Sequence, residues 1–184
     1  KVKYVEKHYG DGDGKGQRIL NPVTEVTMEE GSYMEMEMVQ IKGVDSTKRT
    51  TVADLDKNAK LIVRERLLTH GSQDAESSFV VNLNGEDSSA DVVSRSVAKE
   101  NSHQKFVSQI NGNTRCAGHT ECDAIIMDDA KIVAVPELTA NDVDAALIHE
   151  AAIGKIAGEQ IIKLMTLGLT EEEAEAQIVN GFLK

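Results

Sequence analysis

The sequence predicts a mainly β fold, a solenoid of short stacked strands followed by a short helical segment. Short apolar stretches recur at a nearly constant interval, the apolar residues are mostly small or branched, and helical periodicity appears only in the last 27 residues. A coil of short strands buries its apolar face only against neighbouring coils. Repetition of similar stretches is therefore the pattern that a solenoid requires.

The composition fits a thin interior. The chain has 184 residues, about one domain, and is 40% hydrophobic with no Trp, three Phe and three Tyr. Aromatic rings therefore fill little of the core, and Val, Ile, Leu, Ala and Met must fill the rest. An interior that is one side chain wide would need this mixture more than a helical bundle would.

The first glycine-rich segment is expected to be a loop. Residues 10–16 read GDGDGKG, in which Gly alternates with charge. The Asp-Gly-Asp start is similar to a calcium loop, but the twelfth position falls on Pro22, where a bidentate Glu is required. We therefore expect no calcium site here.

The next segment alternates strictly between apolar and polar residues. In SYMEMEMVQI, residues 32–41, Met34, Met36 and Met38 share one face and Glu35 and Glu37 the other. A period of two predicts a half-buried strand. We interpret the Met stripe as core filling rather than as a copper site.

Five further stretches suggest successive strands between Arg49 and the helical segment. They are AKLIVRERLL from Ala59, AESSFVVNL from Ala75, ADVVSRSV from Ala90, AKIVAVPEL from Ala130 and DAALIHEA near Ala145. The first three begin 16 and then 15 residues apart. An antiparallel sandwich is the alternative, because Asn84-Gly85 and Asn111-Gly112 fit hairpin turns as well as solenoid corners.

Two helices are predicted at the C-terminal end. Residues 160–168 carry apolar side chains at helical spacing, with Gly168 placed as a C-cap. Thr170 and Glu173 form a capping box for a second helix. Its apolar face is formed by Ala174, Ile178, Val179 and Phe182. We therefore divide the chain into a β core, 1–157, expected to lack part of its native N-terminus, and a helical segment, 158–184.

Several function classes are disfavoured. A formal net charge of -11, with scattered Lys and Arg, would repel a nucleic-acid backbone. No apolar run reaches the length of a membrane span, and two cysteines favour a reducing cytosol. The nucleophile elbow, the phosphate-binding lysine loop and the dinucleotide glycine motif are missing, and the HEAAI sequence at 149–153 lacks the second His of a metalloprotease helix.

The densest group of chemically competent residues is RCAGHTECD, residues 115–123. Cys116, His119, Cys122 and the later His149 are potential zinc or iron ligands. On one strand the two thiols would lie roughly 20 Å apart, so only a turn at Ala117-Gly118 would permit a closed zinc site.

Two states of Cys122 remain open at this point. In an extended segment its side chain points away from His119, Glu121 and Asp123. It is then either a buried, inert thiol or, beside a basic group such as His149, a partly ionised thiolate able to accept sulfur or bind iron.

The C-terminal residues resemble the SufB/SufD family of iron–sulfur cluster assembly scaffolds. The resemblance rests on HTECDAIIMDDAKIVAVPEL, on HEAAIGKI at 149–156, on GLTEEEA at 168–174 and on the final NGFL, and it is close over 119–183. It implies a right-handed parallel β-helix with a small helical C-terminal segment.

The resemblance also implies a scaffold rather than an enzyme. Such a scaffold assembles a transient iron–sulfur cluster with a SufC-type ABC ATPase and passes it to apo-proteins in the cytoplasm, with a flavin as a further implied cofactor. By position, Cys122, His149 and Glu150 match residues that handle sulfur, cluster or iron, with Cys116 and His119 as lesser metal candidates. The ATPase would dock on the terminal helices through Ile161, Leu164, Met165 and Leu169.

The chain carries marks of both paralogues. Ile148 stands where SufB commonly has Glu, whereas Pro136-Glu137-Leu138 is more like SufD. A short family member that pairs with itself through the β-helix is the most economical hypothesis, with a SufB/SufD paralogue as the other possible partner. The alternatives are a metal-dependent enzyme using His119, Cys122, His149 and Glu150, and a purely structural solenoid.

Overall fold

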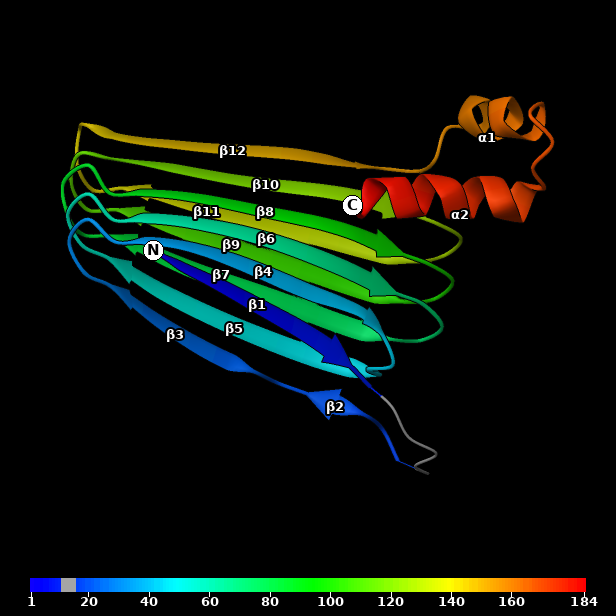
Figure 1. Ribbon diagram of the computed structural model, residues 1–184, viewed down its shortest axis with the longest axis horizontal. Helices are drawn as coiled ribbons and strands as arrows, with labels where there is room; N and C mark the ends of the chain where they lie inside the picture. Colours follow the sequence, from blue (N-terminus) through cyan, green and yellow to red (C-terminus); the bar gives the residue numbers. More distant parts are fainter. Residues whose placement is uncertain (11–15) are drawn as a thin grey trace.

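The computed structural model describes residues 1–10 and 16–184 and shows a β-solenoid of about five turns with two C-terminal helices (Figure 1). One sheet, called sheet A, has the strand order β1-β4-β6-β8-β10-β12, and the other, sheet B, has the order β11-β9-β7-β5-β2 with β3 also paired to β5. Sheet A contains β1 (Val2–Tyr9), β4 (Tyr33–Lys42), β6 (Lys60–Thr69), β8 (Ser89–Ala98), β10 (Cys116–Ile126) and β12 (Ala145–Gly154). Sheet B contains β2 (Ile19–Leu20), β3 (Val23–Met28), β5 (Ser46–Leu55), β7 (Asp74–Leu83), β9 (His103–Gly112) and β11 (Lys131–Ala140).

Every described strand pairing is parallel. The chain alternates between the two sheets, so residues that stack on neighbouring coils are 27 to 29 positions apart in the sequence. The interval of 15 to 16 residues between apolar stretches is thus half a coil. The predicted solenoid is confirmed, and the antiparallel sandwich is wrong.

The core is a single layer of side chains between the two sheets. Met36 and Met38 of β4 are fully buried in it, which confirms the interpretation of the Met stripe as core. Phe79 and Phe106 meet across neighbouring strands of sheet B with ring centroids 5.9 Å apart. Alternating strands present every second side chain to this layer, so small and branched residues fill it.

Tight corners join the strands at fixed places on successive coils. Asn58 and Asp87, one coil apart, both have a positive φ, at 56° and 59°. At the opposite corner Glu100 and Asp128 repeat the pattern at 59° and 54°. This left-handed backbone turns the chain sharply, and Asn and Asp tolerate it better than most residues.

The two helices, α1 (Gly158–Met165) and α2 (Glu171–Phe182), lie at the end of sheet A where the strands terminate (Figure 1). The predicted capping box forms, because Thr170 accepts from the Glu173 backbone N–H and Glu173 accepts from that of Thr170. Val179 of α2 packs with Val97 and Met127 of the solenoid. No helix of the described residues is long and apolar enough to cross a membrane.

The last coil of the solenoid is uncovered on its outer side. β12 is the edge strand of sheet A and β11 the edge strand of sheet B. Leu138 pairs in register with the fully buried Ile110, and Ile153 with the buried Ala124, so both side chains point towards the interior. Each is nevertheless 39% exposed, because no further coil covers it. We call this surface, formed by β11 and β12, the open end.

The predicted glycine-rich loop at 10–16 falls mostly outside the described residues.

Candidate functional site

Strand β10 carries most of the predicted site residues and sorts them onto two faces. It runs without a turn from Cys116 to Ile126, so Cys122 points inward while His119 and Glu121 point outward. The expected separation of Cys122 from His119 and Glu121 is what the structure shows. Because β10 pairs with β8 on one side and β12 on the other, each face of β10 meets two neighbouring strands.

The Cys122 thiol is fully buried. Burial, followed by the nearby negative charges of Glu65 and Asp123, raises its pKa to about 11 from an ordinary value of 9.0. In this arrangement the side chain is a protonated thiol at neutral pH, and the thiolate state considered from the sequence is not populated. In register, Cys122 lies between Ser94 and the small, exposed Ala151 of the open end.

A polar group fills the interior next to this thiol. Glu65, which is 5% exposed, accepts hydrogen bonds from Ser77 and from Ser94, the latter at 2.7 Å. The Arg49 guanidinium lies 4.0 Å from the same carboxylate. Cys122 therefore neighbours an ordered polar interior rather than a purely apolar core.

His149 also faces inward. It pairs in register with the fully buried Thr120, one strand across and two residues away from Cys122, which places the two Cα atoms roughly 8 Å apart at ordinary strand spacing. Its Nδ1 is buried and has no hydrogen-bond partner among the described residues. A buried ring nitrogen without a partner is unusual in a folded protein. Cys122 and His149 thus share the interior face beside the open end.

The two cysteines do not meet. Cys116 and Cys122 stand at the beginning and middle of one uninterrupted strand, and the turn that a closed zinc site needs at Ala117-Gly118 is not formed. Cys116 is buried, and burial raises the pKa of its thiol. The possibility of a closed zinc site using both thiols is therefore wrong, because a continuous strand keeps them far apart.

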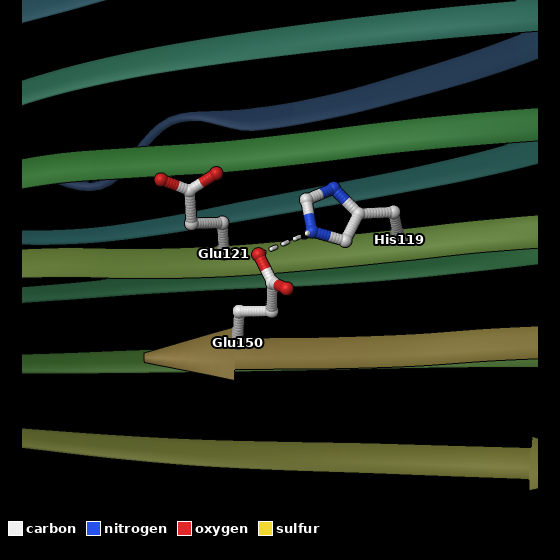
Figure 2. Close-up of side chains that lie close together, drawn as sticks. All are labelled: His119, Glu121 and Glu150. Atoms are coloured by element: carbon white, nitrogen blue, oxygen red, sulfur yellow. Dashed lines mark ion pairs between the residues drawn. The ribbon is translucent and has the colours of Figure 1, made fainter. Parts of the chain in front are cut away.

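A second group assembles on the outer face. His119, Glu121 and Glu150 each direct one potential ligand atom to a common region, with these atoms within 4.8 Å of one another (Figure 2). The Nε2 of His119 lies 3.5 Å from Oε2 of Glu150. The register explains the meeting, since Glu121 and Glu150 are direct neighbours across β10 and β12.

Asp91 of β8 orients the histidine of this group. Its Oδ1 lies 2.8 Å from the His119 Nδ1, and its Oδ2 accepts from the Arg64 guanidinium at 2.5 Å. The hydrogen bond to Asp91, with a smaller contribution from Glu150, raises the pKa of His119 above 6.5. Burial would raise the pKa of Asp91, but hydrogen bonds from His119 and Arg64 outweigh it and lower that pKa.

Glu121 shares a proton with its neighbour on the same face. A hydrogen bond between the carboxyl groups of Glu121 and Asp123, together with burial, raises the pKa of Glu121. Two carboxyl groups this close cannot both ionise freely. A cation placed between His119 and Glu121 would replace that proton as the source of positive charge.

The structure divides the predicted site rather than joining it. Cys122 and His149 lie on the interior face, whereas His119 and Glu150 lie on the outer face. The four-residue site of the metal-enzyme alternative does not form, because the sheet separates its two halves. Sequence reasoning did not select Glu121 or Asp91, and only the register of 28 to 29 residues between coils could have indicated them.

The helical residues selected for docking are partly used within the protein. Ile161, Leu164 and Leu169 are half-buried, whereas Met165 is 43% exposed. The apolar side chains with the greatest exposure on this segment are Ile162 and Leu167, at 62% and 77%. Exposed apolar residues so close together are typical of an interaction surface.

Comparison with known proteins identifies related sequences. Residues 22–182 match the model of the SufBD core domain of the SUF system for FeS cluster assembly. An iron–sulfur cluster assembly SufBD family protein of Methanothermobacter thermautotrophicus is 45% identical over 103 residues, which are 55% of this chain and 25% of the relative.

Two other archaeal proteins match more of the chain. A SufBD family protein of Archaeoglobus fulgidus is 31% identical over 90% of this chain and 45% of its own length. One of Methanocaldococcus jannaschii is 30% identical over 100% of this chain and 58% of its own length. The chain therefore spans between a quarter and about three fifths of the relatives it matches.

Proposed function

This chain belongs to the SufBD core-domain family of the SUF iron–sulfur cluster assembly system, and from this premise we propose that it is a scaffold on which a nascent cluster is built. In this role it binds sulfur and iron transiently and passes the cluster to other proteins, and it catalyses no reaction of its own. The observation that carries the proposal is the position of Cys122 beside His149 on the interior face. A thiol is the protein group that accepts sulfur and ligates iron, and thiolates are the usual ligands of iron–sulfur clusters.

The burial of Cys122 sets a requirement for this function. A protonated thiol inside the solenoid is neither nucleophilic nor accessible, so sulfur can reach it only when the coil next to it opens. β12 is the single strand between Cys122 and the open end, and it leads directly into α1 through residues 155–157. Movement of the helices would therefore act on the strand that covers the thiol.

We infer that a SufC-type ABC ATPase docks on the helical segment and supplies this movement. The exposed side chains Ile162, Met165 and Leu167 form the apolar surface available for such contact. α2 packs against the solenoid through Val179, so it can transmit a displacement to the strands. Docking at one end of the sheet would thus be coupled to exposure of the thiol.

The docking proposal is tested by mixing the full chain with its cognate SufC-type ATPase and measuring the mass of the complex by size-exclusion chromatography with light scattering. Leu167→Glu should abolish association, while the exposed Lys163→Ala on α1 serves as the matched control and should preserve it. A chain ending before Gly158 should also fail to bind. Association of Leu167→Glu and of the truncated chain at the level of the intact protein would contradict the docking site.

The scaffold role is tested in cells that depend on this protein for iron–sulfur cluster assembly. Cys122→Ser should abolish rescue, since the hydroxyl cannot accept sulfur, and His149→Ala should impair it severely. Cys116→Ser is the matched control, because it removes a buried thiol six residues away on the same strand. Full rescue by the Cys122→Ser, His149→Ala double variant would refute the site and favour a structural role for the solenoid.

We also propose that two copies of the chain join at their open ends. The interior-facing Leu138 and Ile153 are left partly exposed there, and Val133 and Ile148 add apolar area on the same two strands. Edge strands with unpaired backbone groups readily pair with another chain. Such a dimer would place two copies of Cys122 one strand away from a shared interface.

Light scattering decides the oligomeric state. The intact chain should have the mass of a dimer, and Ile153→Asp should convert it to a monomer. Val23→Asp, at an exposed valine on β3 far from the open end, should leave the dimer intact. A monomeric intact protein, or a dimer that survives Ile153→Asp, would contradict the interface and direct attention to a SufB/SufD paralogue.

Two consequences of family membership extend the proposal. The scaffold would work in the cytoplasm, where thiols remain reduced. A flavin would serve as electron source for cluster assembly.

A further inference from the structure

We propose that His119, Glu121 and Glu150 bind one divalent first-row transition metal ion on the outer face of sheet A. This site goes beyond the scaffold function, because it requires neither Cys122 nor an ATPase partner. The sheet separates the two, since Cys122 points into the solenoid from the same strand that carries His119 and Glu121 outward. The site would give the protein a place to hold iron apart from sulfur.

The donor atoms are arranged for a common ligand. One atom from each of the three side chains lies within 4.8 Å of the others, on two directly paired strands. Ligand atoms at roughly 2.1 Å from one metal ion are separated by up to about 4.2 Å, so small rotations of the glutamates complete the site. Strands supply a rigid base for these side chains, while Glu150 is exposed enough to adjust.

The charge of the group fits a divalent cation. Three arginines lie in the neighbouring groove, and each has a carboxylate partner outside the group: Arg64 with Asp91, Arg66 with Glu37 and Arg95 with Asp123. Among the described residues, neither Glu121 nor Glu150 has an ion pair with a Lys or Arg. When ionised, the two glutamates carry two negative charges with only the imidazole between them. Such an arrangement is costly unless a proton or a cation occupies it.

The histidine is already oriented as a metal ligand. Asp91 engages the Nδ1 of His119 at 2.8 Å and leaves Nε2 directed towards Glu150. A carboxylate on the second ring nitrogen is the usual support for a metal-bound histidine. Asp91 is itself held by Arg64, so the ring orientation depends on a chain of contacts that reaches across three strands.

The donor set selects among metal ions. One imidazole nitrogen and two carboxylates suit Fe²⁺, Mn²⁺, Co²⁺ and Zn²⁺, whereas Mg²⁺ and Ca²⁺ favour oxygen ligands alone. Three protein ligands leave coordination positions open on the solvent side. Water or a small anionic ligand can occupy them.

Binding is measured on the full-length chain with Co²⁺ under reducing, oxygen-free conditions, by the visible absorbance of the bound ion and by isothermal titration calorimetry. We expect one ion per chain and displacement by Fe²⁺ or Zn²⁺. His119→Gln, Glu121→Gln and Glu150→Gln should each weaken binding at least tenfold. Asp91→Asn should weaken it by about 10- to 100-fold while leaving all three ligands in place.

Matched controls separate this site from other metal-binding groups. His103→Gln and Glu137→Gln alter exposed residues on sheet B and should leave the affinity unchanged. Cys122→Ser should also retain the ion, without the sulfur-to-metal charge-transfer absorbance of a thiolate ligand. Retention by Cys122→Ser distinguishes this site from the proposed sulfur site, whose failure in cells would not affect it.

Two results would overturn the proposal. One is an affinity unchanged by both His119→Gln and Glu150→Gln. The other is binding that disappears with Cys122→Ser. Because Glu150 is 66% exposed, its amide variant should keep the fold, and a thermal melt that matches the intact protein confirms that a loss of binding is local.

Discussion

Cys122 and His119 stand three residues apart on β10, but one faces a packed interior and the other faces water. Their spacing in the strand is odd, so the pleat assigns them to opposite sides. The same rule separates His149 from Glu150 on β12. Chemistry in this molecule is therefore sorted by the parity of a residue within its strand, and neighbours in the sequence can belong to different sites.

The buried thiol should be slow to react. With a pKa of about 11 instead of 9.0, the thiolate fraction of Cys122 at pH 8 falls by about 100-fold. In a Cys116→Ser background, alkylation by iodoacetamide should therefore be at least that much slower in the folded chain than in urea. The rate should rise about tenfold per pH unit up to about pH 11. Rapid labelling at pH 8 in the folded state would show that the thiol is ionised or accessible.

The pH dependence of stability should identify the His119 contact. Because the pKa of His119 is raised in the folded state, the favourable interaction with Asp91 is fully present below the unfolded pKa of about 6.5 and is lost as the pH rises through the folded value. The free energy of unfolding of the intact chain should thus exceed that of His119→Gln most between about pH 5 and 6.5. The difference should shrink at pH 9. Urea titrations at both ends of this range measure it, and a difference that does not vary with pH would contradict the contact.

Part of the site could be predicted from residue types alone. The sequence indicated the facing of Cys122 and of His119, because both lie within one extended segment. It could not reveal that Glu150 joins Glu121, since this contact depends on the length of the intervening coil, and the number of residues in a corner is not visible in a hydrophobic pattern. The burial of Cys122 also depends on strands that are distant in the sequence.

At the level of single elements, the helices were the most predictable part. Thr170, Glu173 and the apolar face after them are local signals, and helix ends are determined by local hydrogen bonds. β9 gave no apolar signal, because its interior positions include Gln104, Ser108 and Gly112. The side chain of Gln104 is satisfied there by Thr69, and that of Ser108 by Thr120. A polar interior conceals the alternation that identifies a strand.

The cap of α2 should matter to the whole terminal segment. Thr170→Ala removes the acceptor for the Glu173 N–H and should lower the free energy of unfolding by about 1 kcal/mol. Glu173→Gln keeps a capping-box side chain and should cost less. Chemical denaturation followed by circular dichroism compares the two. An equal loss for both variants would indicate that charge near the helix start, rather than the hydrogen bond, provides the stabilisation.

For the whole molecule, stability should decline towards the open end. Each coil is held by its neighbours, and the last coil has a neighbour on one side only. In hydrogen exchange, amides of β12 should exchange faster than those of β8 when the chain is monomeric, as in Ile153→Asp. In the proposed dimer, β12 should become protected. Equal and high protection of β12 in a confirmed monomer would show that the open end is stable without a cover.

The regular coil also determines how the molecule would respond to force. Neighbouring strands in each sheet are separated by 27 to 29 residues of chain, and each coil is held chiefly by the two beside it. A molecule stretched between its ends should therefore lengthen in steps instead of in one event. At 3.3 to 3.6 Å per residue, each step would release roughly 100 Å of chain. A motor protein attached to α1 and α2 would pull first on the coil that contains β12, so a modest force could uncover Cys122 while the remaining coils stay wound.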